Sequence, residues 1–324
     1  MTSASVALPL VLGLGRMDAI LAEILGGRAR VVAVDDAADA VAGDLASCQA
    51  IVARGAAAVS GALIDRAPHL RVIARTGVGV ESVDVAAATA RGIPVMTTPG
   101  ANARAVAEGA FALALALTKQ LPLATEIVRE GPFDRREALE IWDLEGETLG
   151  VIGLGHVGRN VARIGQAFGM TILAADPYVD AVTVRGEGIE LAAIDDVVAR
   201  ATVLVACAPH TPQTAGLLDR DRLARLPRGA IFINVGRGSI VDLDDLDDAV
   251  ASGHLAGVGL DVFEPEPPGV HPLFTRPNVI LSPHVFGLSR RARQQMYRLI
   301  GEGVLAVFDG QRPPGVVNPE IYGG

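Results

Sequence analysis

One segment constrains the fold of this chain more than any other: residues 149–176, which read LGVIGLGHVGRNVARIGQAFGMTILAAD. An apolar run leads into Gly153-Leu154-Gly155-His156-Val157-Gly158, a helix-compatible stretch follows, and a second apolar run ends at Asp176. This is the G-x-G-x-x-G pattern in the strand–helix–strand setting that it requires. Gly153 permits a tight turn, Gly155 lets the backbone approach a pyrophosphate, and Gly158 lets the helix pack closely on the strand. We therefore expect a βαβ unit that binds a dinucleotide at the N-terminus of its helix.

The acid at the end of the second run predicts which dinucleotide is bound. Asp176 lies 18 positions after Gly158, where a carboxylate bonds the ribose hydroxyls of NAD and repels the 2′-phosphate of NADP. Pro177 and Tyr178 follow, and no Arg is adjacent. The sequence favours NAD over NADP.

The rest of the chain alternates short apolar runs with longer Ala-rich, helix-compatible segments. Runs that are apolar on both faces and separated by helices are typical of parallel sheets in α/β folds. A length of 324 residues favours two domains. The clearest boundary lies near residue 100, where RGIPVMTTPG (91–100) leads into the apolar helix predicted over 101–121. The runs that we interpret as strands are 31–34, 50–53, 72–74, 149–155, 171–176, 202–208, 230–236, 256–263 and 278–284.

Charged side chains follow three of the later strands. Arg237 comes after 230–236, Asp261 lies near the end of the next run with Glu266 just beyond it, and His284 ends the last one. The carboxyl ends of strands in an open α/β sheet converge on the ligand crevice, so these side chains are candidates to meet there. A guanidinium can bind a carboxylate and a carbonyl together. His is suited to exchange a proton at the developing alkoxide, and a Glu on its other ring nitrogen would fix the tautomer.

Composition excludes several classes of protein. The chain has 28 basic and 37 acidic side chains, a formal charge of −9, and no Lys/Arg-rich run, which argues against nucleic-acid binding. No apolar run reaches the ~20 residues of a membrane helix, and the N-terminus lacks the basic start of a signal peptide. The two cysteines, Cys48 and Cys207, form no metal pattern and predict reduced core thiols. We expect a cytoplasmic protein without a metal.

The glycines at 13 and 15 resemble the start of a second dinucleotide loop. Asp18 occupies the position of its third glycine, which favours a plain strand-to-helix turn.

Seven pieces together resemble the D-isomer-specific 2-hydroxyacid dehydrogenase family, which includes phosphoglycerate dehydrogenases. The resemblance implies that Arg237 binds substrate carboxylate and carbonyl, that His284 is the acid/base and that Glu266 is its partner. The 29-residue interval from Arg237 to Glu266 selects Glu266 over Glu264. It also implies substrate contacts from Arg75, Val78, Gly79, Asn102 and Arg237, and cofactor contacts from Gly153, Gly155, His156, Val157, Gly158, Asp176, Ala208, Pro209, Thr214, Val235, Asp261, His284 and Gly287. The pieces are ARTGVGVESVD (74–84), GIPVMTTPGANARAVAE (92–108), TLGVIGLGHVG (148–158), APHTPQTAGLL (208–218), NVGRGSIVD (234–242), LDVFEPEP (260–267) and SPH (282–284).

The same resemblance implies the architecture. We expect two Rossmann-like or flavodoxin-like, doubly wound parallel-sheet α/β domains with a cleft between them. Residues 1–100 plus 289–324 would form a discontinuous substrate-binding domain, and residues 101–288 the NAD-binding domain. A homodimer would form through the early helices of the NAD domain. Because the sequence ends at 324, we expect no regulatory domains of the kind found in longer phosphoglycerate dehydrogenases.

Three positions depart from the family pattern and bear on the substrate. Gly109 stands where many members carry His, Phe286 where a small residue is usual, and His210 where Leu is usual. The alternatives to a 2-hydroxyacid dehydrogenase are a dehydrogenase of a non-carboxylate analogue such as a phosphonate, and an NAD(H)-sensing scaffold like the corepressors built on this fold.

Overall fold

The structure of the protein is a computed structural model that describes residues 7–15, 17, 19–35, 39, 42–55 and 57–323. The chain divides into two compact units. Unit 1 consists of Met1–Asn102 and Leu288–Gly324, and unit 2 of Ala103–Gly287. The chain therefore passes between them at Asn102 and Leu288, where the sequence suggested boundaries at 100 and 289.

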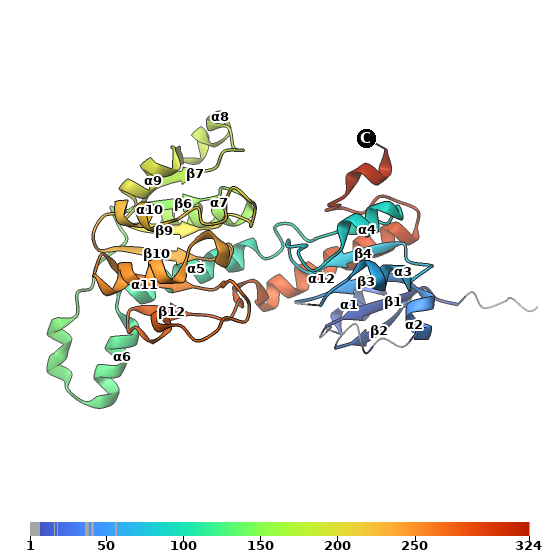
Figure 1. Ribbon diagram of the computed structural model, residues 1–324, viewed down its shortest axis with the longest axis horizontal. Helices are drawn as coiled ribbons and strands as arrows, with labels where there is room; N and C mark the ends of the chain where they lie inside the picture. Colours follow the sequence, from blue (N-terminus) through green and yellow to red (C-terminus); the bar gives the residue numbers. More distant parts are fainter. Residues whose placement is uncertain are drawn as a thin grey trace, which may run out of the picture. The chain divides into compact units, whose positions relative to one another are not determined.

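Unit 1 is built on a five-stranded parallel sheet with the order β2-β1-β3-β4-β5 (Figure 1), which is the flavodoxin-like order. Its strands are β1 (Leu10–Leu14), β2 (Arg30–Val34), β3 (Cys48–Ala53), β4 (Val72–Arg75) and β5 (Val95–Met96). Its helices are α1 (Ile20–Leu25), α2 (Ala42–Ser47), α3 (Gly61–Asp65), α4 (Val85–Ala90), α12 (Arg290–Phe308) and the 3₁₀ helix η7 (Pro319–Tyr322).

Two hydrophobic clusters cover the two faces of this sheet. Alternate residues of a strand point to opposite faces, so Ile51 joins α2, α3 and α4 on one face while Val52 joins α1 and α12 on the other. The C-terminal helix α12 contributes Tyr297, Ile300 and Val304 to the second cluster. The last part of the chain is also fastened here, because the buried Asn318 accepts a hydrogen bond from the Val95 N–H at 2.8 Å.

Unit 2 is built on a seven-stranded parallel sheet with the order β12-β11-β10-β9-β6-β7-β8. Six of these strands reproduce the 3-2-1-4-5-6 order of a dinucleotide-binding fold, with β6 as its first strand and β12 added at the edge. The strands are β6 (Thr148–Ile152), β7 (Thr171–Ala175), β8 (Glu190–Leu191), β9 (Val203–Ala206), β10 (Ala230–Asn234), β11 (Leu255–Leu260) and β12 (Val279–Leu281). The expected pair of doubly wound α/β domains is confirmed.

The helices of unit 2 lie on both faces of its sheet (Figure 1). One cluster joins α5 and α7 to residues such as Val151 and Ile233, and the other joins α9, α10 and α11 to residues such as Ile152 and Phe232. The helices are α5 (Ala103–Thr118), α6 (Leu121–Glu130), α7 (His156–Ala167), α8 (Ala181–Val184), α9 (Ile194–Arg200), α10 (Arg220–Arg225) and α11 (Leu243–Ala251). The 3₁₀ helices are η2 (Phe133–Ala138), η3 (Arg185–Glu187), η4 (Gly238–Ile240), η5 (Pro272–Thr275) and η6 (Phe286–Leu288), the last of which ends at the passage to unit 1.

The segment after α5 is less enclosed than the rest of unit 2. In Figure 1, α6 and the segment that follows it stand away from the sheet of their unit. Their exposed side chains include Leu121, Val128, Phe133 and Ile141. Among the described helices, no single one is long and apolar enough to cross a membrane. The pair α5 and α6 passes that test by length and composition only together, with a bend of 54°.

Of the two glycines near the N-terminus, Gly13 lies inside β1 and Gly15 follows the end of the strand. β1 ends at Leu14, Gly15 has a φ of +83°, and α1 begins at Ile20. A Cβ atom on Gly15 would lie 2.9 Å from the Arg54 carbonyl oxygen, so glycine at this position lets the backbone pass close to the end of β3. Asp18, on which the argument against a dinucleotide site depended, lies outside the described residues.

Candidate active site

The glycine loop of unit 2 has the geometry that an anion requires. β6 ends at Ile152, Gly153 turns with a φ of +89°, and α7 begins at His156 with Gly155 as its N-cap. A Cβ atom on Gly158 would overlap the carbonyl oxygen of Gly153, so only glycine lets α7 pack this closely on the loop. A Cβ on Gly155 would meet nothing within 4 Å. The open space lies beside the N-terminus of a 12-residue helix, whose N–H groups and dipole favour a pyrophosphate.

Asp176 holds this loop from the end of the neighbouring strand. Its Oδ2 atom accepts a hydrogen bond from the Leu154 N–H at 2.8 Å, and its Oδ1 atom accepts one from the Tyr178 N–H at 2.9 Å. The side chain is partly exposed. The structure therefore gives Asp176 a part in shaping the glycine loop, in addition to the ribose contact that the sequence predicts.

A tight turn after β10 carries Arg237. Asn234 is fully buried; its Oδ1 accepts from the Gly236 N–H at 3.1 Å, and its Nδ2 donates to the Arg237 carbonyl at 2.9 Å. Gly238 has no room for a side chain, because a Cβ there would overlap the Phe263 carbonyl group. Asn234 was not predicted as a site residue. The signal was present: a polar side chain ends the otherwise apolar strand AIFIN.

Glu266 and His284 form the central pair of the site. Glu266 Oε2 lies 2.8 Å from His284 Nδ1, while its Oε1 accepts from the Phe263 N–H at 3.0 Å. A carboxylate only accepts hydrogen bonds, so Nδ1 carries the proton and Nε2 is the ring atom left for proton exchange. Both side chains keep access to solvent, with 48% of His284 and 38% of Glu266 exposed. His284 also has a φ of +52°, an unfavourable conformation for a residue with a side chain and one that is common at functional sites.

Asp261 organises the segment that contains His284. The residue is 2% exposed, and its Oδ1 accepts from the Ser282 hydroxyl at 2.7 Å and from the Val285 N–H at 3.0 Å. Its Oδ2 accepts from the Phe286 N–H at 3.3 Å. Burial raises the pKa of the Asp261 carboxyl, and these hydrogen bonds oppose the shift. The nicotinamide contact predicted for Asp261 stays a prediction, because its carboxylate already serves residues 282–286.

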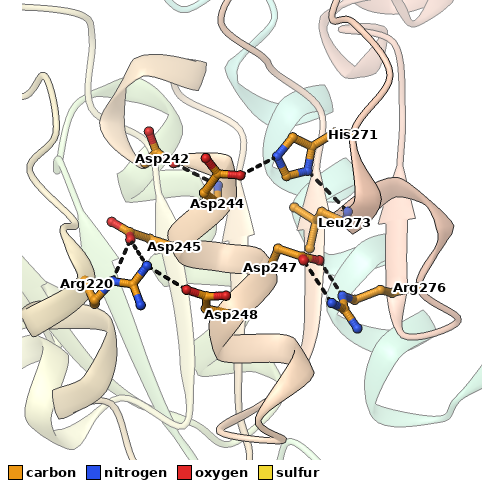
Figure 2. A network of polar contacts seen from close by, with 9 residues as sticks. All are labelled: Arg220, Asp242, Asp244, Asp245, Asp247, Asp248, His271, Leu273 and Arg276. Atoms are coloured by element: carbon orange, nitrogen blue, oxygen red, sulfur yellow. Dashed lines mark hydrogen bonds and ion pairs between the residues drawn. The ribbon is translucent and has the colours of Figure 1, made fainter.

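Helix α11 anchors the far end of the loop that carries Glu266 (Figure 2). His271 Nε2 lies 3.1 Å from Asp244 Oδ1, and Arg276 forms a two-point ion pair with Asp247. The Leu273 N–H donates to His271 Nδ1 at 3.2 Å, so the neutral His271 ring carries its proton on Nε2 and donates it to Asp244. The hydrogen bond from Arg276 lowers the pKa of the Asp247 carboxyl, which therefore stays charged in this pair. These contacts fix η5 and the start of β12 between Glu266 and His284.

Sheet topology explains why these side chains are neighbours. Arg237 follows β10, Asp261 and Glu266 follow β11, and His284 follows β12, and these three strands are adjacent and parallel. The remaining predicted cofactor residues of unit 2 lie at the same edge. The loop after β9 contacts the glycine loop, because a Cβ on Gly153 would lie 2.9 Å from Ala208. The other predicted residues follow the ends of strands at this edge: His156 and Val157 after β6, Pro209 and Thr214 after β9, Val235 after β10, and Gly287 after β12. Their individual contacts to a cofactor stay predictions.

The predicted substrate residues Arg75, Val78, Gly79 and Asn102 belong to unit 1. β4 ends at Arg75, and Gly77 then turns with a φ of +93° while its N–H donates to the Thr98 hydroxyl at 3.0 Å. Within the described ranges, neither the Val78 nor the Gly79 N–H donates to a backbone carbonyl. Such adjacent N–H groups suit a carboxylate. The role of this loop stays a prediction.

Other polar groups have structural partners. His210, at the edge of the site after β9, lies 2.7 Å from the Ser239 hydroxyl through Nδ1. Cys48 and Cys207 are free thiols, and burial raises the pKa of Cys48 to about 11 and that of Cys207 to about 12, which favours the thiol over the thiolate form at neutral pH. In the part of the chain that the structure describes, no group of three His, Cys, Asp or Glu side chains is arranged to hold a metal ion.

Comparison with known proteins identifies the family of the chain. Residues 111–285 match the family model described as "D-isomer specific 2-hydroxyacid dehydrogenase, NAD binding domain". D-3-phosphoglycerate dehydrogenase of Mycobacterium tuberculosis is 37% identical over 323 residues, which cover 97% of this chain and 61% of that protein. The chain thus spans about three-fifths of the length of this relative, and about half of the Archaeoglobus fulgidus one.

Two solved structures are similar along nearly the whole chain. D-lactate dehydrogenase from Aquifex aeolicus, complexed with NAD and lactic acid, has a TM-score of 0.85 at 26% identity and covers 95% of this chain and 99% of its own. An NADPH-dependent glyoxylate/hydroxypyruvate reductase from Sinorhizobium meliloti, in complex with NADP and malonate, has a TM-score of 0.84 at 33% identity and covers 96% of this chain and 97% of its own. The resemblance therefore includes both units.

Proposed function

Because the chain belongs to the D-isomer specific 2-hydroxyacid dehydrogenase family, we propose that it is an NAD-dependent oxidoreductase that interconverts a D-2-hydroxy acid and its 2-oxo acid. Residues 111–285, which lie within unit 2, match the NAD-binding domain of this family, and this supports unit 2 as the coenzyme domain. The observation that carries the proposal is the 2.8 Å pair of Glu266 and His284 on the strand edge that also bears Arg237 and the glycine loop.

In the proposed reaction, Arg237 binds the substrate carboxylate and carbonyl through its planar guanidinium. When bound, the nicotinamide supplies or accepts the hydride at C2. As an oxo acid is reduced, His284 Nε2 donates a proton to the carbonyl oxygen; as a hydroxy acid is oxidised, Nε2 takes the hydroxyl proton back. Glu266 holds the imidazole through Nδ1 and so keeps Nε2 directed to proton exchange.

A panel of 2-oxo acids with NADH and NADPH tests this function. Glyoxylate, hydroxypyruvate, pyruvate, phenylpyruvate and 3-phosphohydroxypyruvate should each be offered, with loss of nicotinamide absorbance as the readout. We expect turnover of at least one of them with NADH. Turnover of phosphonate analogues alone would favour the non-carboxylate alternative. Tight NADH binding without any turnover would favour a sensing scaffold.

The choice of NAD is proposed to depend on the negative charge of Asp176. We expect Asp176→Asn to raise the efficiency with NADPH relative to NADH by roughly 10- to 100-fold, about 1.4–2.8 kcal/mol, because the repulsion of the 2′-phosphate is lost. Steady-state kinetics with both coenzymes measure this ratio. Asn keeps one oxygen that can accept from the Leu154 N–H, so the glycine loop should remain in place, and only the hydrogen bond from the Tyr178 N–H is lost.

Asp176→Ala provides the matched comparison. It removes both the charge and the acceptor for Leu154, so it should also weaken the binding of both coenzymes. An unchanged NADH/NADPH ratio in both variants would exclude Asp176 as the determinant.

We further propose that the protein is a cytoplasmic homodimer formed through α5, α6 and the segment after α6. The exposed apolar side chains Leu121, Val128, Phe133 and Ile141 suit a surface that a second copy covers. Sedimentation velocity should give a mass near twice the 33.5 kDa of the chain. The double variant Val128→Glu/Phe133→Glu should sediment as a monomer. A wild-type protein that is monomeric at micromolar concentration would contradict this proposal.

A further inference from the structure

The ring of Phe286 lies directly on the backbone of α5 at Gly109. A Cβ atom on Gly109 would overlap the Cγ and Cδ2 atoms of Phe286 and lie 2.8 Å from its Cβ. The Cβ and Cγ atoms are the root of the side chain, so rotation of the ring would not relieve this overlap. Phe286 is partly buried and packs against the core cluster that contains α5. Gly109 and Phe286, two of the residues noted above as departures from the family pattern, therefore contact each other.

The other side of the same segment is held by Asp261. Its buried carboxylate accepts hydrogen bonds from the N–H groups of Val285 and Phe286 at 3.0 and 3.3 Å. The residue pair 285–286 is therefore fixed between a carboxylate and a helix. His284 comes immediately before this pair.

His284 is held at its backbone, where its N–H donates to the Asp261 carbonyl oxygen at 2.8 Å, but its side chain has little support. It follows β12, a three-residue strand at the edge of the sheet, and its backbone has a φ of +52°. Its side chain is 48% exposed, and its ring has a hydrogen bond to Glu266. A small displacement of the backbone would break this 2.8 Å contact, because hydrogen bonds weaken steeply with distance and angle.

We propose that Phe286 is a positioning residue: its contact with Gly109 sets the His284 imidazole against Glu266. This inference rests on the proposed function for its kinetic consequence, while the contact itself is independent of it. A shift of a fraction of an ångström in a proton-exchanging group changes the rate of the reaction far more than it changes the affinity for substrate.

A double-mutant cycle on stability tests the contact. Gly109→Ala should lower Tm in the wild-type background, because its Cβ collides with Phe286. In the Phe286→Ala background, Gly109→Ala should raise Tm, because the space is free and alanine favours a helix over glycine. A change in Tm of the same sign for Gly109→Ala in both backgrounds would contradict the contact.

Kinetics and spectroscopy test the positioning. Phe286→Ala should lower kcat by about 10- to 100-fold with little change in KM or in the Kd for NADH, as expected for a displaced reacting group. Phe286→Leu, which keeps the branched Cγ, should recover most of the activity. Phe168→Ala is the matched control, since it removes another partly exposed ring of unit 2, one stacked on Phe111 at 5.4 Å, and should leave kcat unchanged.

The tautomer of His284 gives a readout that needs no turnover. Nitrogen-15 NMR of the imidazoles, with the His284 signals identified by their loss in His284→Gln, should show Nδ1 protonated in the wild type and a mixture of tautomers in Phe286→Ala. A Phe286→Ala protein that loses stability but keeps kcat and a single His284 tautomer would contradict the positioning role and show that Phe286 only packs the core. If the wild type reduces no 2-oxo acid, the proposed function fails, while the tautomer and the Tm cycle still decide the role of Phe286.

Discussion

Replacement of His284 by alanine is expected to lower kcat for 2-oxo acid reduction by about 10²- to 10⁴-fold, the usual contribution of a general acid. Affinity for NADH should be largely retained, because His284 is one of many predicted coenzyme contacts and the glycine loop and Asp176 lie at other strands of the sheet. Stopped-flow reduction measures the chemical step, and quenching of NADH fluorescence or calorimetry measures coenzyme binding.

Two control variants sharpen this result. Glu266→Gln keeps an oxygen that can accept from Nδ1 but removes the charge, so its loss of kcat should be smaller than that of His284→Ala. His69→Ala changes an exposed histidine of unit 1 and should have no effect. Turnover of His284→Ala at the wild-type rate would reject the acid/base role.

The second large effect is expected from the glycine loop, where two substitutions separate binding from folding. Gly155→Ala should fold with an unchanged Tm, because its backbone φ of −75° suits alanine and no atom lies within 4 Å of the added Cβ. The same Cβ would occupy the space expected for the pyrophosphate. We expect its affinity for NADH to fall by about 100-fold or more, at least ~2.8 kcal/mol.

Gly158→Ala should behave differently. Its Cβ would overlap the Gly153 carbonyl oxygen, so α7 must move and the fold loses stability, by about 1–3 kcal/mol for an overpacked site. Thermal melts with and without NADH distinguish the two variants. A Gly155→Ala protein that binds NADH as the wild type does would refute the dinucleotide site at this loop.

Much of the fold could be predicted because its central strands are buried on both faces. β3, β6, β9 and β10 appear in the sequence as continuous apolar runs, which are the easiest strands to find. β8 was not predicted, because the two residues Glu190 and Leu191 have no periodicity. The helix predicted over 101–121 is shorter, Ala103–Thr118, and is followed by α6 after a turn at Gln120 with a φ of +47°.

The candidate site was predictable in its residue types and less so in its internal contacts. The pairing of Glu266 with His284 was expected and is present at 2.8 Å. The parts played by Asn234, Ser282 and Asp261 depend on hydrogen bonds to backbone groups, whose directions a sequence does not reveal. Gly109 and Phe286 were both recognised as unusual. Their contact joins positions 177 residues apart, 286 minus 109, and only the fold brings them together.

The discontinuity of unit 1 has a consequence for its biosynthesis. The sheet is complete once Met96 is made, but Tyr297, Ile300 and Val304 of α12 cover one of its faces. Unit 2 is contiguous and intervenes in the chain. At the usual 5–20 residues per second, the ribosome needs roughly 10–40 s to pass from the end of the sheet to the end of α12. The nascent N-terminal sheet therefore keeps the part of this face that α12 covers exposed throughout the synthesis of unit 2, and unit 1 is expected to complete its folding only after unit 2 has been made.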